Sequence, residues 1–261
     1  MNELQLNDAK NYKEFYGRII EQMPKLVAEG RTPLSVSGLM RRRLEVLNSP
    51  GNVRSSYWDN YFDTGDAIAY HPDGKAKIVL DTRQLRELTP SSQLKDNALV
   101  LPAGVYDELE GVEFSREDLE KYASGEWLKQ KDVTSNKIWQ ALARDGKLLD
   151  DYAKAVFSQV RERYDSNISM ALFVDSARDV PIIRSWYVGR LDDDFRSNAS
   201  GRCHLDGGYG RLVGVQVAPE AQSASPDVAG PTLDQVVSVT APYVADMNRE
   251  SLRRDLRGLY K

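Results

Sequence analysis

The sequence is poor in cysteine and in histidine. Its 261 residues contain a single cysteine, Cys203, and two histidines, His71 and His204. One thiol cannot form an intramolecular disulfide, and it cannot complete a zinc site built from several cysteines. We therefore expect a fold held together by noncovalent contacts, with no metal and no cofactor.

Long apolar runs are also missing. Residues 1–20 contain Lys, Glu, Asp and Asn throughout, unlike the apolar centre of a signal peptide, and no run is long enough for a transmembrane helix. We expect a protein without membrane insertion, cytoplasmic by default or displayed through another component.

No excess of positive charge is present, because 35 Lys and Arg face 39 Asp and Glu, for a net charge of −4. This balance argues against a broad surface for nucleic acid. The one basic run, "MRRR" at Met40–Arg43, is typical of the solvent face of a helix. With 41% apolar and 28% charged residues, the composition is that of a folded globular protein.

The spacing of apolar residues predicts a mixed α+β chain. Helical spacing predicts helices over 8–28, 37–47 and 115–123, the last with Ser115 as N-cap, and a helix pair within 135–164 that breaks at Gly146. Alternating or β-branched runs predict a hairpin over 66–81 around "HPDG", with further strands within 98–109, 169–175, 180–188 and 210–217. We expect one domain over 1–221, followed by a connector and a polar helix within 222–261.

Between the last two strands, Val188–Val215 shows no periodicity and omits a particular group of five residue types. It contains no Lys, Glu, Gln, Met or Trp, which make up roughly a fifth of an ordinary chain, yet it holds the only cysteine and one of the two histidines. Free replacement of the adenines in asparagine codons that end in a pyrimidine would give codons for every residue type seen here. It would give no codon for any of the five missing types.

The strand "VPIIRSWYV", the irregular segment and the closing "GRLVGV" resemble the variable proteins of diversity-generating retroelements, in particular the archaeal branch. The resemblance covers about 180–221. In that family an error-prone reverse transcriptase rewrites adenines of a C-terminal cassette. It implies a C-type lectin-like fold of the formylglycine-generating-enzyme type, with short antiparallel strands, two central helices and a displayed variable segment at about 184–215.

That resemblance also implies a receptor-like protein whose ligand, a protein or a cell-surface group, differs from copy to copy. Large apolar residues and one arginine are expected to form the scaffold: Arg184, Trp186, Leu191, Leu205, Leu212 and Val213. The exposed variable set is expected to be Tyr187, Gly189, Arg190, Asp192, Asp193, Asp194, Phe195, Asn198, Ser200, Arg202, Cys203, His204, Asp206, Gly207, Gly208 and Tyr209. Such a mixture of aromatic and small polar residues is typical of an antibody paratope.

Other interpretations of the same residues exist. Asp192–Asp194 could hold calcium, although the ligand spacing of a calcium loop is missing, and "DGGYG" at 206–210 could bind phosphate. An enzyme with the formylglycine-generating-enzyme fold would need a reactive cysteine pair, and adjacent Cys203 and His204 point to opposite sides of an extended chain. We expect no catalytic residue and a monomer, with an enzyme or an assembly protein as the alternative.

Overall fold

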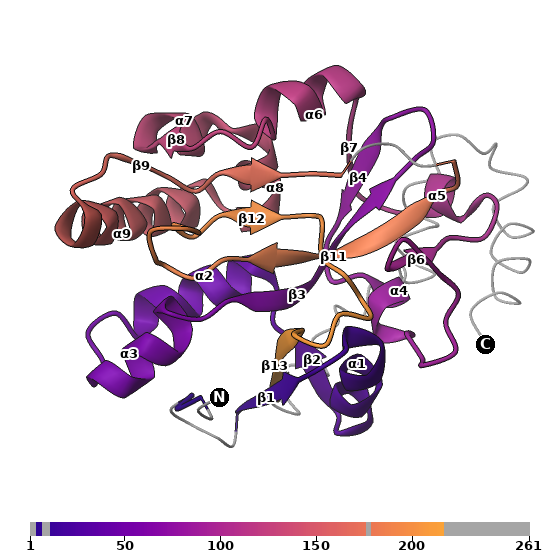
Figure 1. Cartoon of the computed structure of the whole chain (residues 1–261), viewed down its shortest axis with the longest axis horizontal. Coiled ribbons are helices and arrows are strands. Elements are labelled where there is room, and N and C mark those ends of the chain that lie inside the picture. The colour runs from indigo at the N-terminus through magenta and orange to yellow at the C-terminus, as the bar shows by residue number, and fades with distance from the viewer. Residues whose placement is uncertain (1–3, 7–10, 176–178, 217–261) are drawn as a thin grey trace, which may run out of the picture. The chain divides into compact units, whose positions relative to one another are not determined.

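The structure is a computed structural model that describes residues 4–6, 11–175 and 179–216 (Figure 1). The chain divides into two units, Met1–Gln216 and Val217–Lys261, and all described residues belong to the first. The expected domain boundary near residue 221, the connector and the helix over 248–259 therefore lie outside the described residues.

Helices and strands alternate along the first unit. The helices are α1 (Ile19–Ala28), α2 (Val36–Glu45), α3 (Gly51–Trp58), α4 (Arg83–Arg86), α5 (Val105–Glu108), α6 (Arg116–Tyr122), α7 (Gln130–Ser135), α8 (Lys137–Ala143) and α9 (Gly146–Tyr164). The strands are β1 (Tyr12–Tyr16), β2 (Arg31–Pro33), β3 (Phe62–Tyr70), β4 (Ala76–Val79), β5 (Leu94–Lys95), β6 (Ala98–Val100), β7 (Val112–Phe114), β8 (Leu128–Lys129), β9 (Ile168–Ser169), β10 (Leu172–Phe173), β11 (Ile182–Val188), β12 (Ala199–Ser200) and β13 (Arg211–Gln216).

The main sheet is built around β3 and β11, which pair antiparallel from Ile182 opposite Tyr70 to Val188 opposite Phe62. Its longest path runs β1-β13-β3-β11-β12-β10. Most ladders are antiparallel, as expected, but β10–β12 and β13–β3 pair in parallel. The order places β13, the end of the described chain, between the first strand and the central strand.

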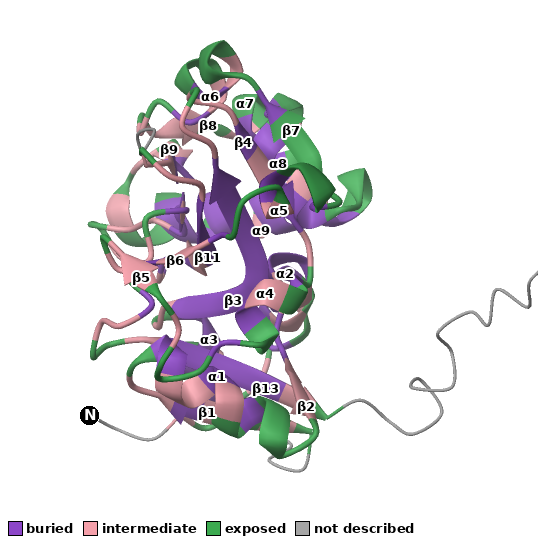
Figure 2. Cartoon of the chain, turned by 90° about the vertical axis from the view of Figure 1, so that its right-hand side faces the viewer, coloured by how far each residue is buried: buried purple, intermediate pink, exposed green. Residues whose placement is uncertain are grey.

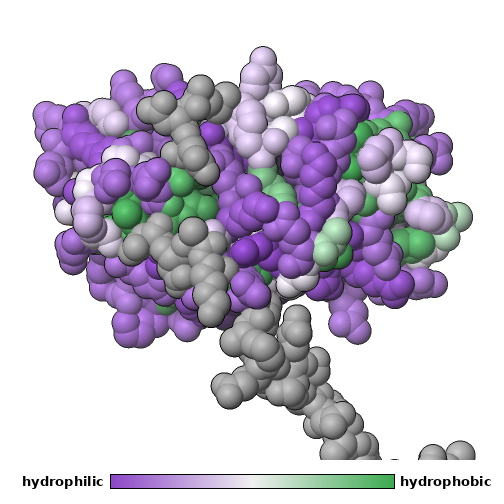
Figure 3. Space-filling view, turned by 90° about the horizontal axis from the view of Figure 1, so that it is seen from below, coloured by the Kyte–Doolittle hydropathy of each residue, from purple (hydrophilic) through white to green (hydrophobic). Residues whose placement is uncertain are grey.

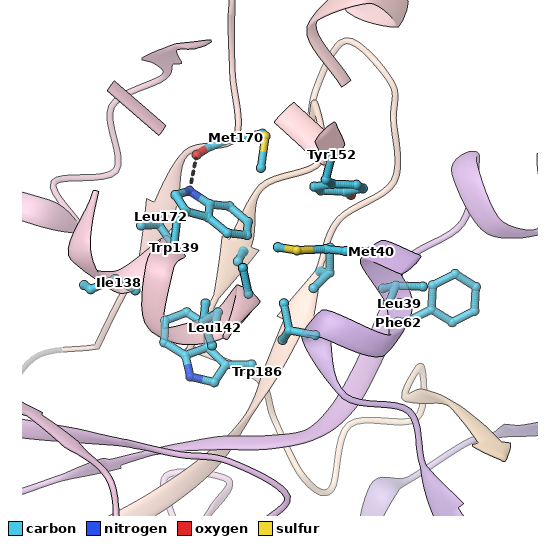
Figure 4. Close-up of a cluster of buried hydrophobic side chains, with 14 of the residues drawn as sticks. Leu39, Met40, Phe62, Ile138, Trp139, Leu142, Tyr152, Met170, Leu172 and Trp186 are labelled. Atoms are coloured by element: carbon cyan, nitrogen blue, oxygen red, sulfur yellow. Dashed lines mark hydrogen bonds between the residues drawn. The ribbon is translucent and has the colours of Figure 1, made fainter. Parts of the chain in front are cut away.

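Both faces of the central strand are covered, so every residue of β3 is buried (Figure 2). Ile68 and Tyr70 belong to a core that includes α2, α3, α8 and α9, whereas Ala67 and Ala69 belong to a second core that includes α1, α4 and α5. Alternate residues of a strand point to opposite faces, and this separates the two cores. Figure 4 shows the first core, where the indole of Trp139 donates to the Met170 carbonyl at 2.9 Å.

Several expected elements are confirmed, and each has a local cause. The Ser115 hydroxyl accepts from the Asp118 amide at the start of α6. The pair α8 and α9 breaks at Arg144, whose backbone is left-handed, and Asp145 caps α9 by accepting from Lys147 and Leu148. The "HPDG" hairpin joins β3 to β4, with Gly74 at a φ of 95°.

The helix expected over 8–28 is wrong in its first half. Residues Tyr12–Tyr16 form β1, which pairs with β13, and α1 begins only at Ile19. Gly17 lies between them at a φ of 130°, a backbone conformation that favours glycine. The partner strand lies about 200 residues further along the chain, so local spacing could not reveal the pairing. Helix α3 is not among the helices that the sequence predicts.

Among the described residues, none of the helices has the length and apolar character needed to cross a membrane. Seen from below Figure 1, the described surface is largely hydrophilic, with smaller hydrophobic patches between polar residues (Figure 3). The large hydrophobic residues that stay exposed in the described part are Val27, Val112 and Tyr209.

Candidate ligand-binding surface

The aperiodic segment forms two loops on either side of a short strand. We call residues 189–198 loop A and residues 201–210 loop B. Strand β12 separates them and pairs with the end of β11, Val188 opposite Ala199. Loop A is therefore a hairpin connection, and its ends are joined by a bond from the Gly189 amide to the Asn198 carbonyl at 2.8 Å.

Arg43 on α2 holds the base of loop A. Its side chain is fully buried and donates to the Gly189 carbonyl at 2.9 Å and to the Ser197 hydroxyl at 3.0 Å. The other acceptors are the carbonyls of Tyr57 and Asn60 and the hydroxyl of Tyr152. The run "MRRR" was interpreted as a solvent face, and this is wrong for Met40 and Arg43, because both are buried.

Backbone bonds fix the rest of loop A to the scaffold. The Leu191 amide donates to the Trp58 carbonyl at 2.7 Å, and the Arg196 carbonyl accepts from the Met170 amide at 3.0 Å. Leu191 itself is buried in the first core. Arg196 and Ser197 have φ values of 40° and 57°, so the loop turns back through two left-handed residues.

The acidic run of loop A contacts arginines of the same loop. Asp192 forms an ion pair with Arg190 and accepts from the Phe195 amide at 2.8 Å, and Asp193 lies 2.7 Å from Arg196. The Arg190 guanidinium also stacks over the Phe195 ring, 4.9 Å from its centre. Within the described ranges, no three His, Cys, Asp or Glu side chains come together as a metal site would require.

Loop B is held by Arg184 of β11. This buried arginine donates to the Cys203 carbonyl at 2.9 Å and to the Asp96 carbonyl at 2.6 Å, and lies 3.2 Å from Asp175. Leu205 fixes the middle of the loop, since its side chain is fully buried and its amide donates to the Asn97 carbonyl at 2.9 Å. Near the end of the loop, the Gly210 carbonyl accepts from the Gly17 amide.

The structure buries all six residues expected as scaffold, namely Arg184, Trp186, Leu191, Leu205, Leu212 and Val213. The expected variable set is divided. The exposed members are Asp193, Asp194, Arg202, His204, Gly208 and Tyr209. Half-buried are Tyr187, Arg190, Asp192, Phe195, Ser200, Cys203, Asp206 and Gly207.

Gly189 and Asn198 correct that expectation, because both are buried. A Cβ atom added at Gly189 would collide with the Asn198 side-chain oxygen and would lie 3.1 Å from the Phe195 Cβ. Close packing at the loop base therefore excludes free replacement at both positions. Both residues therefore lie in the buried base of loop A.

Loop B and the sheet together line a pocket of about 350 Å³. Its lining residues are Tyr61, Asp63, Tyr187, Cys203, His204, Gly207, Tyr209 and Gly210. The rings of Tyr61 and Tyr187 are tilted against each other with centres 5.5 Å apart. Tyr209 is 75% exposed, whereas Asp63 is 2% exposed, so the pocket extends from an open aromatic rim to a buried carboxyl group.

Asp63 of β3 receives a hydrogen bond on each carboxyl oxygen. The Cys203 thiol donates to Oδ1 at 2.7 Å, and the Arg211 amide donates to Oδ2 at 2.8 Å. Burial raises the pKa of Asp63 to about 6, because the charged form is poorly solvated. The pKa of the Cys203 thiol is also raised, first by burial and then by the neighbouring charge of Asp63.

Arg43, Asp63 and Tyr61 were missed as site residues by the sequence analysis. All three lie more than 120 residues before the loops they contact. The available signals were weak. Arg43 lies in a run of arginines, and Asp63 is an aspartate inside a β-prone stretch, but neither pattern indicates which residues these side chains contact.

Neither protein-family models nor curated proteins provide a match to this chain. One solved structure is similar to this chain. It is described by the words "Accommodation of massive sequence variation in Nanoarchaeota by the C-type lectin fold". The similarity covers 81% of this chain and 100% of that chain, with a TM-score of 0.60 and 18% sequence identity. This chain thus has a mixed α+β architecture with the C-type lectin fold.

Proposed function

We propose that this C-type lectin fold is a receptor-like variable protein of a diversity-generating retroelement, and that loops A and B present its binding surface. One observation carries the proposal: the scaffold holds both loops largely through their backbone. Arg43 and Arg184 bind loop carbonyls, and Leu191 and Leu205 use their amides. Because these bonds fix the path of each loop through its backbone, they do not depend on the exposed side chains between the anchored residues, and those side chains can change.

The side chains that point away from these anchors support a binding role. Tyr209 and His204 are exposed at the pocket, next to half-buried Tyr187. An exposed aromatic residue at a concave site is a common feature of binding surfaces, where aromatic anchors provide much of the affinity. The ligand that fits this chemistry is a macromolecule such as a protein or a cell-surface group, and not a nucleic acid.

The proposal includes no catalytic role. A reactive cysteine is normally a thiolate with a lowered pKa, whereas Cys203 donates to a carboxyl group and has a raised pKa. The His204 ring lies beside Asn97, and its Nδ1 is 3.3 Å from the side-chain amide of Asn97. The Cys203 and His204 side chains thus have separate partners. The proposed protein acts as a monomer without a cofactor.

A pair of combinatorial libraries tests this function. In the first, the six exposed loop residues are randomised with codons of the type NNY, which encode the same restricted set of residues. In the second, the six expected scaffold residues are randomised in the same way. We expect most members of the first library to resist protease like the parent, because a substitution at an exposed position usually changes the free energy of unfolding by less than about 0.5 kcal/mol. We expect few members of the second library to resist protease.

Display of the folded first-library members against several unrelated proteins then tests binding itself. We expect selection to enrich different loop sequences for different targets. If the first library unfolds as extensively as the second, or if no target enriches any sequence, the proposed function is refuted.

A further inference from the structure

The pocket beside loop B contains a buried carboxyl group without a cationic partner. Among the described residues, no Lys, Arg or His forms an ion pair with Asp63. The charge of Arg211 lowers the pKa of Asp63, but the hydrogen bond from Arg211 to Asp63 comes from the backbone amide and not from the guanidinium. Its guanidinium lies 2.9 Å from Glu14 and also contacts Asn60.

An unpaired buried charge is costly, because the protein interior solvates it less well than water does. At neutral pH the Asp63 carboxyl is ionised in spite of this cost, since its pKa is about 6. The two hydrogen bonds it accepts come from a thiol and an amide, neither of which carries positive charge. A cation that entered the pocket would supply the missing charge.

The walls of the pocket suit a cation as well. Tyr61, Tyr187 and Tyr209 line it, and the faces of aromatic rings attract ammonium and guanidinium groups. An apolar guest would remove water from Asp63 without replacing its interactions, and an anionic guest would be repelled. The volume of about 350 Å³ lies at the small end of ligand pockets, which suits a single side chain.

We propose that this pocket takes one cationic side chain, arginine or lysine, from the surface of a protein ligand, with Asp63 as its counter-ion and the tyrosine rings as its walls. The inference rests on the proposed function and specifies one group that the binding surface recognises. Asp63 belongs to the scaffold, so the preference for a cation is set by the fixed part of the site, and loop residues such as Tyr209 shape the entrance.

Titration of the full chain with small probes tests the inference. The probes are N-acetyl-arginine amide, N-acetyl-lysine amide and the uncharged N-acetyl-citrulline amide, which has nearly the shape of the arginine probe. Binding is followed at pH 7.5 from the NMR shifts of the Gly207 and Tyr209 amides. We expect both cationic probes to bind about tenfold more tightly than citrulline, or more, because only they pair with the buried charge.

Three variants complete the test. Asp63→Asn should abolish the preference for cations, and Tyr209→Ala, at an exposed position that leaves folding intact, should weaken all three probes severalfold. Asp132→Asn is the matched control, because it neutralises an exposed aspartate on α7 that does not line the pocket. It should leave every affinity unchanged.

Equal binding of arginine and citrulline would overturn the inference, as would absence of binding by any probe, or a preference that survives Asp63→Asn. None of these results affects the library experiment, which concerns the tolerance of the loops and not the guest of one pocket. Conversely, loss of folding in the loop library would refute the proposed function even if arginine bound.

Discussion

The anchor at the base of loop A gives a sharp prediction for stability. Replacing Arg43 by methionine keeps much of the side-chain volume but removes every donor. The hydroxyls of Tyr152 and Ser197 keep each other as partners, at 2.6 Å, so the main loss concerns two buried carbonyls, those of Tyr57 and Gly189, and the half-buried carbonyl of Asn60. A buried acceptor left without its donor costs about 1–3 kcal/mol. We expect Arg43→Met to lower the free energy of unfolding by about 4 kcal/mol.

Urea unfolding followed by tryptophan fluorescence measures this loss, and Arg41→Met on the same helix is the control. Arg41 is exposed, so its replacement should change the free energy of unfolding by less than about 0.5 kcal/mol. Hydrogen exchange at the Leu191 and Ser197 amides should also accelerate in Arg43→Met. If the two variants are equally stable, Arg43 does not hold the loop, and the reasoning about backbone anchors is wrong.

Two further predictions concern positions around the loops. Burial raises the pKa of Asp63 from 3.8 to about 6, so the folded protein holds this proton more tightly than the unfolded chain does. The stabilisation by the protonated carboxyl is complete below about pH 4 and is lost as pH rises through 6, which lowers the free energy of unfolding by about 3 kcal/mol. Asp63→Asn should remove this pH dependence in denaturation curves, and a variant with the parent's pH profile would contradict the assignment. Gly189→Ala should lower the unfolding free energy by about 1–3 kcal/mol through overpacking. Gly208→Ala, in open space, should leave it unchanged, and equal effects of the two would contradict the buried loop base.

Locally encoded elements could be predicted from the sequence. The Ser115 cap, the break before Gly146 and the "HPDG" turn are each determined by residues within a few positions of one another. Their chemistry, a side-chain oxygen at a helix start or a glycine at positive φ, depends on no distant partner. The same holds for the absence of period in 188–215, which indicated loops between two strands.

Features that depend on distant partners could not be predicted. Strand β1 forms because β13 lies beside it, and Arg43 is buried because loop A brings carbonyls to it. Gly189 and Asn198 show the same limit within the loops. Glycine and asparagine occur both in exposed turns and in tightly packed positions, so only the structure distinguishes an exposed position from a packed one.

Sequencing of this gene across individuals of its source population tests the central claim most directly. If the loops are a rewritten binding surface, substitutions will concentrate at the exposed positions, among them Arg202, His204 and Tyr209. Codons for Trp186, Leu205 and Gly189 will stay constant. Replacements that are spread evenly over the gene, or loops that are identical in all individuals, would contradict the account and leave a C-type lectin fold without a variable surface.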